Sequence, residues 1–288
     1  MPDADFLSPA TLPEAVKALG AAGAGAKVLA GGTDLLAQAR SGRVRPSVII
    51  DLKRIPGLIG ITESAAGFEI GAATPGAQIG EHAGLEKAWP GVVEAATLIG
   101  STQVQGRASL GGNLCNASPA ADSVPALIAA GAIAVIEGPD GRRELPVEQI
   151  QVSPGRNSLG AGEILVALRL PPRPARSSDA YLRLIPRTEM DIAVVGAGVS
   201  LTLDAAGVIT AARVSVGAVA PTTLLVPEAG AALVGSKLDD AAVAAMEAAV
   251  KAVCKPISDK RGTAEYRTRI AAVLSRRAAH IAYERASA

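Results

Sequence analysis

The sequence predicts an α+β protein built from two domains. Its 288 residues are about twice the roughly 150 residues of an average domain, so each part can bury a core of ordinary size. Strand and helix patterns alternate in the first part of the chain, whereas residues 192–219 read as two long apolar strands that helices follow. Strands and helices that are separated along the chain in this way favour α+β over a doubly wound parallel sheet.

The first domain is expected to cover residues 1–176, and its first subdomain, up to about residue 56, reads as a βαβ-like unit. Thr11 and Glu14 form a capping box for a helix that we expect to stop at Gly20. An apolar strand, a helix and a second strand are expected to follow at residues 27–30, 35–41 and 47–51.

The second subdomain, residues 57–176, mixes strands and helices around one long loop. The expected strands are residues 68–73, 132–137, 143–145 and 164–170, and the expected helices are residues 78–87 and 92–98. Residues 103–120 are polar, rich in Gly, Ser and Asn and without apolar periodicity, which predicts a functional loop. Prolines in residues 171–178 then end the regular structure and mark a domain boundary.

The C-terminal domain, residues 177–288, is expected to hold an antiparallel hairpin followed by helices. Its strands, residues 192–203 and 208–219, are joined by a turn that ends at Gly207. The expected helices are residues 227–234, 239–253 and 264–284. In the last helix, apolar side chains recur at helical spacing and predict the buried face: Tyr266, Ile270, Val273, Leu274 and Ile281.

Composition excludes several classes of function. The 28 Lys and Arg balance 27 Asp and Glu, so the chain has no broad basic face for nucleic acid or an anionic membrane. Cys115, Cys254, His82 and His280 offer neither a disulfide framework nor the ligand spacing of zinc or iron–sulfur sites. The longest uncharged apolar stretches are shorter than the roughly 18 residues of a membrane span. The acidic start, Met1–Asp5, lacks export-signal features, and a cytoplasmic protein is expected.

Two glycine pairs stand at candidate ligand-binding turns. Gly31-Gly32 lies between an apolar strand and a helix, where the backbone amides from Gly31 to Asp34 and the Thr33 hydroxyl can converge on a phosphate. Gly111-Gly112 lies in the segment from Ser109 to Asp122, whose Asn113 and Asn116 add uncharged donors. A diphosphate held between two such turns fits both pairs. The alternatives are a tight strand-to-helix turn for the first pair and a capped surface loop for the second.

The sequence shows little acid–base machinery. Arg183, Arg187, Glu189 and Asp191 precede the apolar strand that begins at Ile192, and mixed charges at this spacing are more typical of a solvated loop than of a site. Neither a Ser/His/Asp nor a Cys/His arrangement is present, because Cys115 has no obvious base. If the protein performs redox chemistry, the reactive atoms must therefore belong to a cofactor.

The motifs occur in a recognisable order along nearly the whole chain. The segments are Phe6–Pro9, Leu29–Leu35, Asp51–Leu52, Ile70–Ala72, Ser109–Asn113, Ala117–Asp122, Tyr181, Met190–Ala193 and Ala264–Arg267. Each motif is weak alone, whereas the ordered set at this spacing is specific. It resembles the FAD-binding medium subunit of molybdenum hydroxylases, the carbon monoxide dehydrogenase and xanthine dehydrogenase family.

The resemblance implies a fold and a binding site. The fold is an FAD-binding domain of the vanillyl-alcohol-oxidase type (PCMH-type) with two α/β subdomains, followed by a C-terminal three-stranded sheet with a helical bundle. Leu165, Arg183 and Ile192 match positions close to the isoalloxazine, where Ile192 would cover one ring face. The full set of FAD-binding residues that it implies is Leu29, Ala30, Gly31, Gly32, Thr33, Asp34, Leu35, Ser109, Gly111, Gly112, Asn113, Cys115, Asn116, Asp122, Leu165, Arg183 and Ile192.

The resemblance also implies partners and a path for electrons. A large molybdopterin subunit would oxidise the substrate, a small subunit would carry 2Fe-2S clusters, and FAD in this chain would reduce an external acceptor such as NAD or a quinone. The complex would be a dimer of heterotrimers. Thr33 stands where covalent flavoproteins of the wider fold carry a histidine, so noncovalent FAD is expected. Residues 103–108 and 171–178 are the expected partner contacts. The alternatives are a self-sufficient FAD-dependent oxidoreductase acting on a small molecule and a nonenzymatic binding module.

Overall fold

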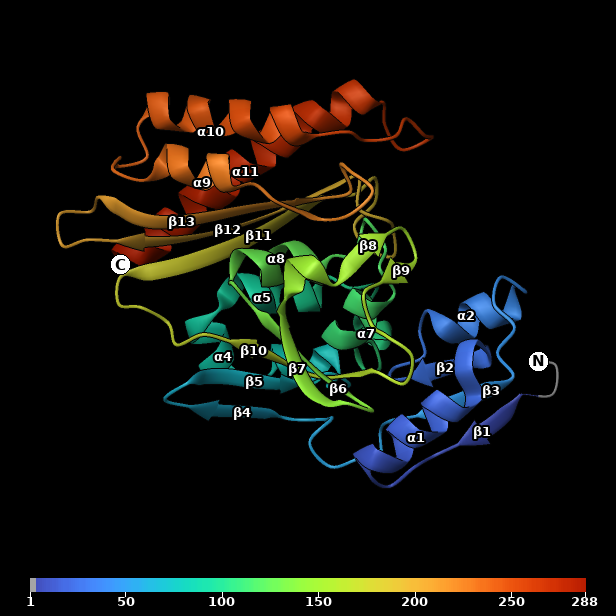
Figure 1. The fold of residues 1–288 in the computed structure, drawn as a ribbon. Coiled ribbons are helices and arrows are strands. Elements are labelled where there is room, and N and C mark those ends of the chain that lie inside the picture. Colours follow the sequence, from blue (N-terminus) through green and yellow to red (C-terminus); the bar gives the residue numbers. More distant parts are fainter. Residues whose placement is uncertain (1–3) are drawn as a thin grey trace.

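The chain begins with a small parallel sheet (Figure 1). The computed structural model describes residues 4–288. The first sheet has the order β1-β3-β2 and consists of β1 (Asp5–Leu7), β2 (Ala26–Leu29) and β3 (Val48–Asp51). Helix α1 (Leu12–Ala22) packs on β2 and β3, and helix α2 (Leu35–Arg40) follows β2. The predicted βαβ-like unit is confirmed, and β1 adds a strand to it.

Helix α1 begins as predicted and ends later. The capping box is present, because the Glu14 amide donates to Thr11 Oγ1 at 3.4 Å and the Thr11 amide donates to Glu14 Oε2 at 3.2 Å. The predicted stop at Gly20 is wrong, since the helix continues to Ala22. The chain leaves the helix at Gly23, whose φ of +57° requires glycine-like freedom.

A five-stranded antiparallel sheet forms the second unit. Its order is β4-β5-β10-β6-β7, and its strands are β4 (Ile61–Ser64), β5 (Gly67–Gly71), β6 (Ile133–Gly138), β7 (Gly141–Pro146) and β10 (Ile164–Leu170). A separate two-stranded ribbon consists of β8 (Gln151–Ser153) and β9 (Arg156–Asn157). The predicted hairpin around Pro139-Asp140-Gly141 is confirmed as β6–β7.

Short helices fill the space between β5 and β6. They are α3 (Gly76–Gly80), α4 (Ala83–Ala88), α5 (Pro90–Thr97), α6 (Thr102–Gln105), α7 (Leu110–Cys115) and α8 (Ser123–Ala129). The helix predicted at residues 78–87 is wrong in extent, because His82 Nδ1 accepts from the Leu85 amide at 3.0 Å and starts a new helix there. Residues 103–120 were expected to be a loop and instead contain α7 and most of α6.

The third unit is a four-stranded antiparallel sheet covered by helices. The sheet has the order β11-β12-β13-β14, with β11 (Ser177–Leu184), β12 (Val195–Leu203), β13 (Ile209–Gly217) and the two-residue β14 (Leu224–Leu225). Helices α9 (Pro227–Leu233), α10 (Asp240–Val253) and α11 (Ala264–Ser287) cover one face, and α5 and α8 lie against the other (Figure 1). The predicted hairpin and three helices are confirmed, whereas the expected three-stranded sheet has four strands, because the two-residue β14 pairs with β13.

The buried face of α11 differs from the predicted one. Tyr266 is 36% exposed, and Ile270, Val273 and Ile281 are only partly buried. The fully covered stripe is made mostly of alanine: Ala271, Ala272, Leu274, Ser275, Ala278, Ala279, Ala282 and Ala286, with Arg267 at its start. Small side chains let the helix lie close to β11 and β12, so its larger apolar residues fall on the flanks.

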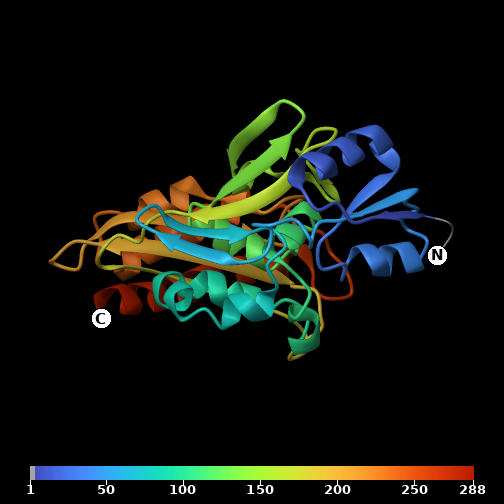
Figure 2. The same ribbon diagram turned by 90° about the horizontal axis from the view of Figure 1, so that it is seen from below.

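Three apolar cores hold these units together. One lies under the five-stranded sheet, one between the C-terminal sheet and its helices, and one between α1 and the sheets of the first two units. Figures 1 and 2 both show the first unit at one end of the molecule and the C-terminal residue at the other. Within residues 4–288, no helix has the length and apolar character needed to cross a membrane.

Candidate functional site

The two glycine turns predicted from the sequence lie together in the structure. The first joins β2 to α2, and the second leads into α7. A Cβ placed on Gly31 would lie only 1.9 Å from the Arg107 carbonyl oxygen, so the backbones of the two segments touch. Beside this contact, Gln38 Nε2 donates to Asn116 Oδ1 at 3.0 Å. Segments from two different units of the fold therefore form one continuous surface.

The first turn presents unpaired backbone donors. Within residues 4–288, the amides of Gly31, Gly32, Thr33 and Asp34 donate to no protein acceptor. Gly32 has a φ of +78°, a left-handed conformation that favours glycine. Successive amides in such a turn form a concave group of partial positive charges, which is a recurring anion-binding arrangement.

Each glycine pair has one member packed against backbone. A Cβ on Gly31 would overlap the Arg107 carbonyl, and a Cβ on Gly111 would lie 2.4 Å from the Ala72 carbonyl oxygen. At Gly112, by contrast, a Cβ would approach only Ser109 Oγ, at 3.1 Å. Gly31 and Gly111 thus allow close packing of the chain, whereas the side-chain position at Gly112 faces only the Ser109 hydroxyl, which accepts from the Gly112 amide.

Lys53 supports the first turn, although it was not among the residues predicted for the site. Its Nζ donates to the Ala30 carbonyl at 3.1 Å and pairs with Asp51 Oδ1 at 2.5 Å. The turn is thereby tied to β3 and has a positive charge beside it. The available signal was Asp51 at the end of a buried strand, followed two residues later by a lysine.

Asn113 and Asp122 are held by different partners. Asn113 Oδ1 accepts from Ser123 Oγ at 2.7 Å and from the Ser123 amide at 3.2 Å. Asp122 Oδ2 accepts from Arg183 Nη1 at 2.8 Å, and Oδ1 accepts from the Tyr181 hydroxyl at 3.1 Å. The consecutive residues Asp122 and Ser123 therefore connect β11 to the second glycine turn.

Burial controls the ionisation of this cluster. Desolvation raises the pKa of Asp122, and the Arg183 charge together with the hydrogen bonds from Arg183 and Tyr181 opposes that rise. Burial also raises the pKa of Tyr181 well above its ordinary value, so its phenol stays protonated and remains a donor. The Arg183 side chain is 5% exposed. The expectation that this arginine belongs to a solvated loop is wrong.

The remaining predicted residues occupy varied positions. Cys115 and Asn116 end α7, next to Gln38, and burial raises the pKa of the Cys115 thiol to about 12, which rules out a reactive thiolate at neutral pH. Leu165 is buried at the bulge of β10. Ile192 is 54% exposed in the connection between β11 and β12. Leu165 and Ile192 have no polar side-chain atom, so only packing could join them to a ligand.

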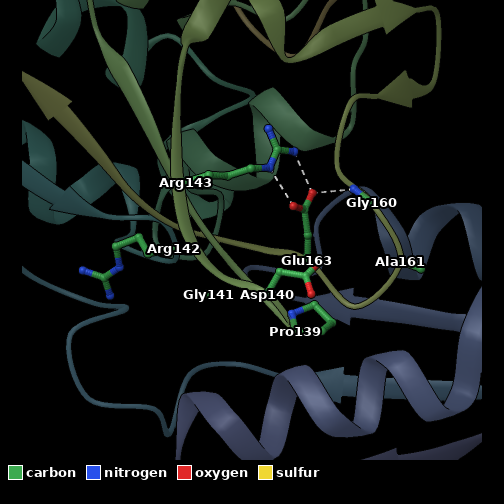
Figure 3. Close-up of a pocket in the computed structure, with 9 residues that line it drawn as sticks. Pro139, Asp140, Gly141, Arg142, Arg143, Gly160, Ala161 and Glu163 are labelled. Carbon is green, nitrogen blue, oxygen red and sulfur yellow. Dashed lines mark hydrogen bonds and ion pairs between the residues drawn. The ribbon is translucent and has the colours of Figure 1, made fainter.

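A cavity of about 290 Å³ lies at the tip of the β6–β7 hairpin (Figure 3). Arg143 donates to Glu163 from Nε at 2.6 Å and from Nη2 at 2.7 Å, and Arg142 donates to Glu137 at 3.0 Å. Both guanidinium groups in this cavity are therefore neutralised by carboxylates. The glycine turns, with their unpaired donors, remain the stronger candidate for an anionic ligand.

Comparison with known proteins decides the family. Residues 2–173 match the FAD binding domain in molybdopterin dehydrogenase, and residues 180–282 match the CO dehydrogenase flavoprotein C-terminal domain. The chain belongs to this family of FAD-binding subunits. The carbon monoxide dehydrogenase medium chain of Hydrogenophaga pseudoflava is 33% identical to it over 99% of this chain and 98% of the relative. That of Afipia carboxidovorans is 34% identical over 98% and 97%.

Solved structures agree with this assignment. One chain of a Cu,Mo-CO dehydrogenase superposes on this FAD-binding subunit with a TM-score of 0.94 at 33% identity, and 98% of each chain is covered. The predicted fold class, the FAD cofactor and the oxidoreductase assignment are confirmed. This protein is an FAD-binding medium subunit of the molybdenum hydroxylases, the family that includes carbon monoxide dehydrogenase and xanthine dehydrogenase.

The residues of the FAD-binding subunit fit the diphosphate of FAD. A diphosphate presents only hydrogen-bond acceptors, and the first turn offers a run of unpaired amide donors. The absence of a side chain at Gly112 leaves space for an oxygen beside the second turn. Within residues 4–288, no three His, Cys, Asp or Glu side chains gather closely enough to ligate a metal.

Proposed function

We propose that this chain is the electron-transferring flavin subunit of a heterotrimeric molybdenum hydroxylase. A large molybdopterin subunit oxidises the substrate, and a small subunit passes the electrons through 2Fe-2S clusters to this chain. An external acceptor such as NAD or a quinone then receives them, and the heterotrimers pair into a dimer. Bound FAD supplies the electron-carrying chemistry, and the protein contributes binding, orientation and electrostatics.

The observation that carries the proposal is the meeting of the two glycine turns. The amides from Gly31 to Asp34 and the segment from Ser109 to Asn113 bind the diphosphate from two sides. Leu29, Ala30 and Leu35 frame the first turn, and Gly111, Cys115 and Asn116 support the second. Both turns are joined at Gly31 and Gln38, so one ligand can contact both.

The flavin ring lies on the side of Asp122 and Arg183 in this proposal. The pair is buried and mutually neutralised, which places a fixed, oriented dipole beside the ring. Leu165 and Ile192 contact the ring by packing. FAD is held without a covalent bond, because Thr33 stands in the first turn and both histidines of the chain, His82 and His280, lie outside the site residues.

Purification of the tagged chain from its native host tests the complex. We expect a large and a small partner to co-purify, with molybdenum, iron and FAD in the ratio of the proposed heterotrimer. We also expect FAD to appear in the supernatant after acid precipitation. A lone chain that turns over an organic substrate without molybdenum or iron would instead establish a self-sufficient FAD-dependent oxidoreductase.

Two exposed segments are proposed as partner contacts. Residues 103–108 lie at and after α6, and residues 171–178 connect the five-stranded sheet to β11. Gln103, Gly106 and Arg107 are exposed, as are most of residues 171–176. Chemical cross-linking of the purified complex checks this proposal, because cross-links from these segments to the small or large subunit are expected.

A further inference from the structure

Ser123 is a buried polar residue beside the proposed FAD site, and it has no role in the site as described above. It is the first residue of α8 and is fully buried. Its hydroxyl and its backbone amide both donate to the same atom of Asn113, at 2.7 and 3.2 Å. A backbone amide can only donate, so the atom that faces Ser123 must be the carboxamide oxygen. The orientation of the Asn113 side chain is therefore fixed by chemistry.

The other end of the carboxamide is free. Within residues 4–288, Asn113 Nδ2 donates to no acceptor. The atom is not buried, so solvent or a ligand can reach it. Asn113 directly follows Gly112, which has no side chain to cover the turn. The free amino group thus stands at the part of the second turn that a ligand can approach.

Orientation matters because the two ends of a carboxamide have opposite polarity. A diphosphate oxygen accepts hydrogen bonds, so the amino group attracts it and the carboxamide oxygen repels it. We propose that Ser123 is a positioning residue, which locks Asn113 with its amino group toward the diphosphate of FAD and so makes the second turn a site of donors only. This inference rests on the proposed binding of FAD at the glycine turns.

A double-mutant cycle on FAD affinity tests the proposal. The dissociation constant of FAD is measured by flavin fluorescence on the full-length apoprotein for wild type, Ser123→Ala, Asn113→Ala and the double variant. Ser123→Ala is expected to weaken binding about tenfold, since one of two hydrogen bonds that hold Asn113 is lost. In the Asn113→Ala background, Ser123→Ala is expected to cause no further loss, because no carboxamide remains to be oriented.

Two further variants separate positioning from folding. Ser275→Ala is the matched control, because Ser275 is also a fully buried serine but its hydroxyl has no partner; FAD affinity should stay at the wild-type value. Asn113→Asp keeps an acceptor for Ser123 and replaces the amino group with a second carboxylate oxygen. It should weaken FAD binding more than Asn113→Ala does. Thermal melting of each apoprotein shows whether the variant is folded.

Three outcomes overturn the inference. The first is an unchanged dissociation constant in Ser123→Ala. The second is equal weakening of binding by Ser123→Ala in both backgrounds, which would show that Ser123 acts through the fold. The third is wild-type affinity in Asn113→Asp, which would show that Asn113 does not donate to the ligand. Failure of the proposed function is distinct, because wild type itself would then take up no FAD in the same titration.

Discussion

At the residue scale, Gly31 and Gly112 differ in what occupies the place of the missing side chain. Gly31→Ala is expected to destabilise the fold, because its Cβ would lie 1.9 Å from the Arg107 carbonyl oxygen. Overpacking of this kind costs about 1–3 kcal/mol or more. Gly112→Ala should leave the melting temperature of the apoprotein nearly unchanged and lower the flavin content of the purified protein. Thermal melting and the flavin-to-protein absorbance ratio check both expectations. Equal losses of stability in the two variants would make both glycine pairs structural.

The phenol of Tyr181 gives a prediction on pH dependence. Its hydrogen bond opposes the raised pKa of Asp122, so Tyr181→Phe should raise that pKa further. An acid whose folded-state pKa is raised loses stability as pH increases from its unfolded pKa through the folded one. The destabilisation caused by Tyr181→Phe should therefore be smaller at pH 4 than at a pH where Asp122 is ionised. Urea unfolding across this pH range measures it.

Tyr283→Phe is the control for this experiment. The Tyr283 hydroxyl donates to the Gly207 carbonyl at 2.7 Å, and a carbonyl does not titrate. Its loss should therefore cost the same free energy of unfolding at every pH. If the two variants show the same pH profile, the Tyr181 phenol does not influence the ionisation of Asp122.

The site residues that could be predicted from the sequence are those with an informative local pattern. Those whose role depends on distant contacts could not be predicted. The glycine pairs, Asn113 and Asn116 stand in segments whose small and polar composition indicates a ligand. Ser123 and Lys53 act on atoms 10 and 23 residues away, and neither has an unusual neighbourhood in the sequence. Only the folded chain brings them beside the turns.

At the element scale, the difference between local signals and distant contacts also explains which helices could be predicted from the sequence. Long helices such as α10 and α11 have caps and apolar periodicity, and they were predicted. Helix α7 was not, because glycines have low helix propensity and give no apolar period. It forms because Ser109 caps it and because Gly111 packs on Ala72. Tertiary contacts thus stabilise a helix that the local sequence disfavours.

Strand β11 contains a buried carboxylate that should make stability depend on pH. Burial raises the pKa of Asp179 to about 6, although Arg173, 3.3 Å away, opposes the rise. Glu94 adds to the rise and Arg285 opposes it. The unfolded chain releases this proton near pH 4, so wild type should lose stability between about pH 4 and 6.

Asp179→Asn removes this titration. Its free energy of unfolding relative to wild type should increase by about 2 kcal/mol between pH 4 and pH 7. Urea unfolding at several pH values measures the difference. If the free energies of unfolding of the two proteins change with pH in the same way, the pKa of Asp179 is not raised in the fold.

The alanine stripe of α11 predicts intolerance to larger side chains. Ala278 is fully buried and faces the C-terminal core, so Ala278→Leu should destabilise the protein by about 1–3 kcal/mol through overpacking. His280, two residues later, is exposed, and His280→Leu should change the melting temperature little. Thermal melting of both variants decides whether close packing or overall helix hydrophobicity holds α11 in place.

At the scale of the whole molecule, arginines fasten the C-terminal unit to the second one. Arg213 donates to the Ile128 carbonyl from Nε at 3.0 Å and from Nη2 at 2.9 Å, and Nη2 also donates to Glu148 at 3.1 Å. Arg285 pairs with Glu94 at 2.5 Å. With the Arg183–Asp122 pair, these contacts join the C-terminal unit to the second unit, which contributes one of the two glycine turns.

FAD should therefore stabilise the entire chain. At a free FAD concentration about 100 times the dissociation constant, binding adds about 2.7 kcal/mol to the free energy of unfolding. Removal of FAD should lower the melting temperature in a single cooperative transition. The Gly112→Ala variant should respond less to added FAD at the same concentration. A melting temperature that is independent of FAD in wild type would contradict a ligand shared by two units.

The contact between the glycine turns has a consequence for how the protein matures in the cell. Gln38 and Asn116 are separated by 78 residues, so the binding surface exists only after both segments have reached their final positions. A nascent chain with only its first unit folded has half of the site and cannot retain the yellow cofactor. Flavin colour therefore reports that the segments around Gln38 and Asn116 have come together in the same chain.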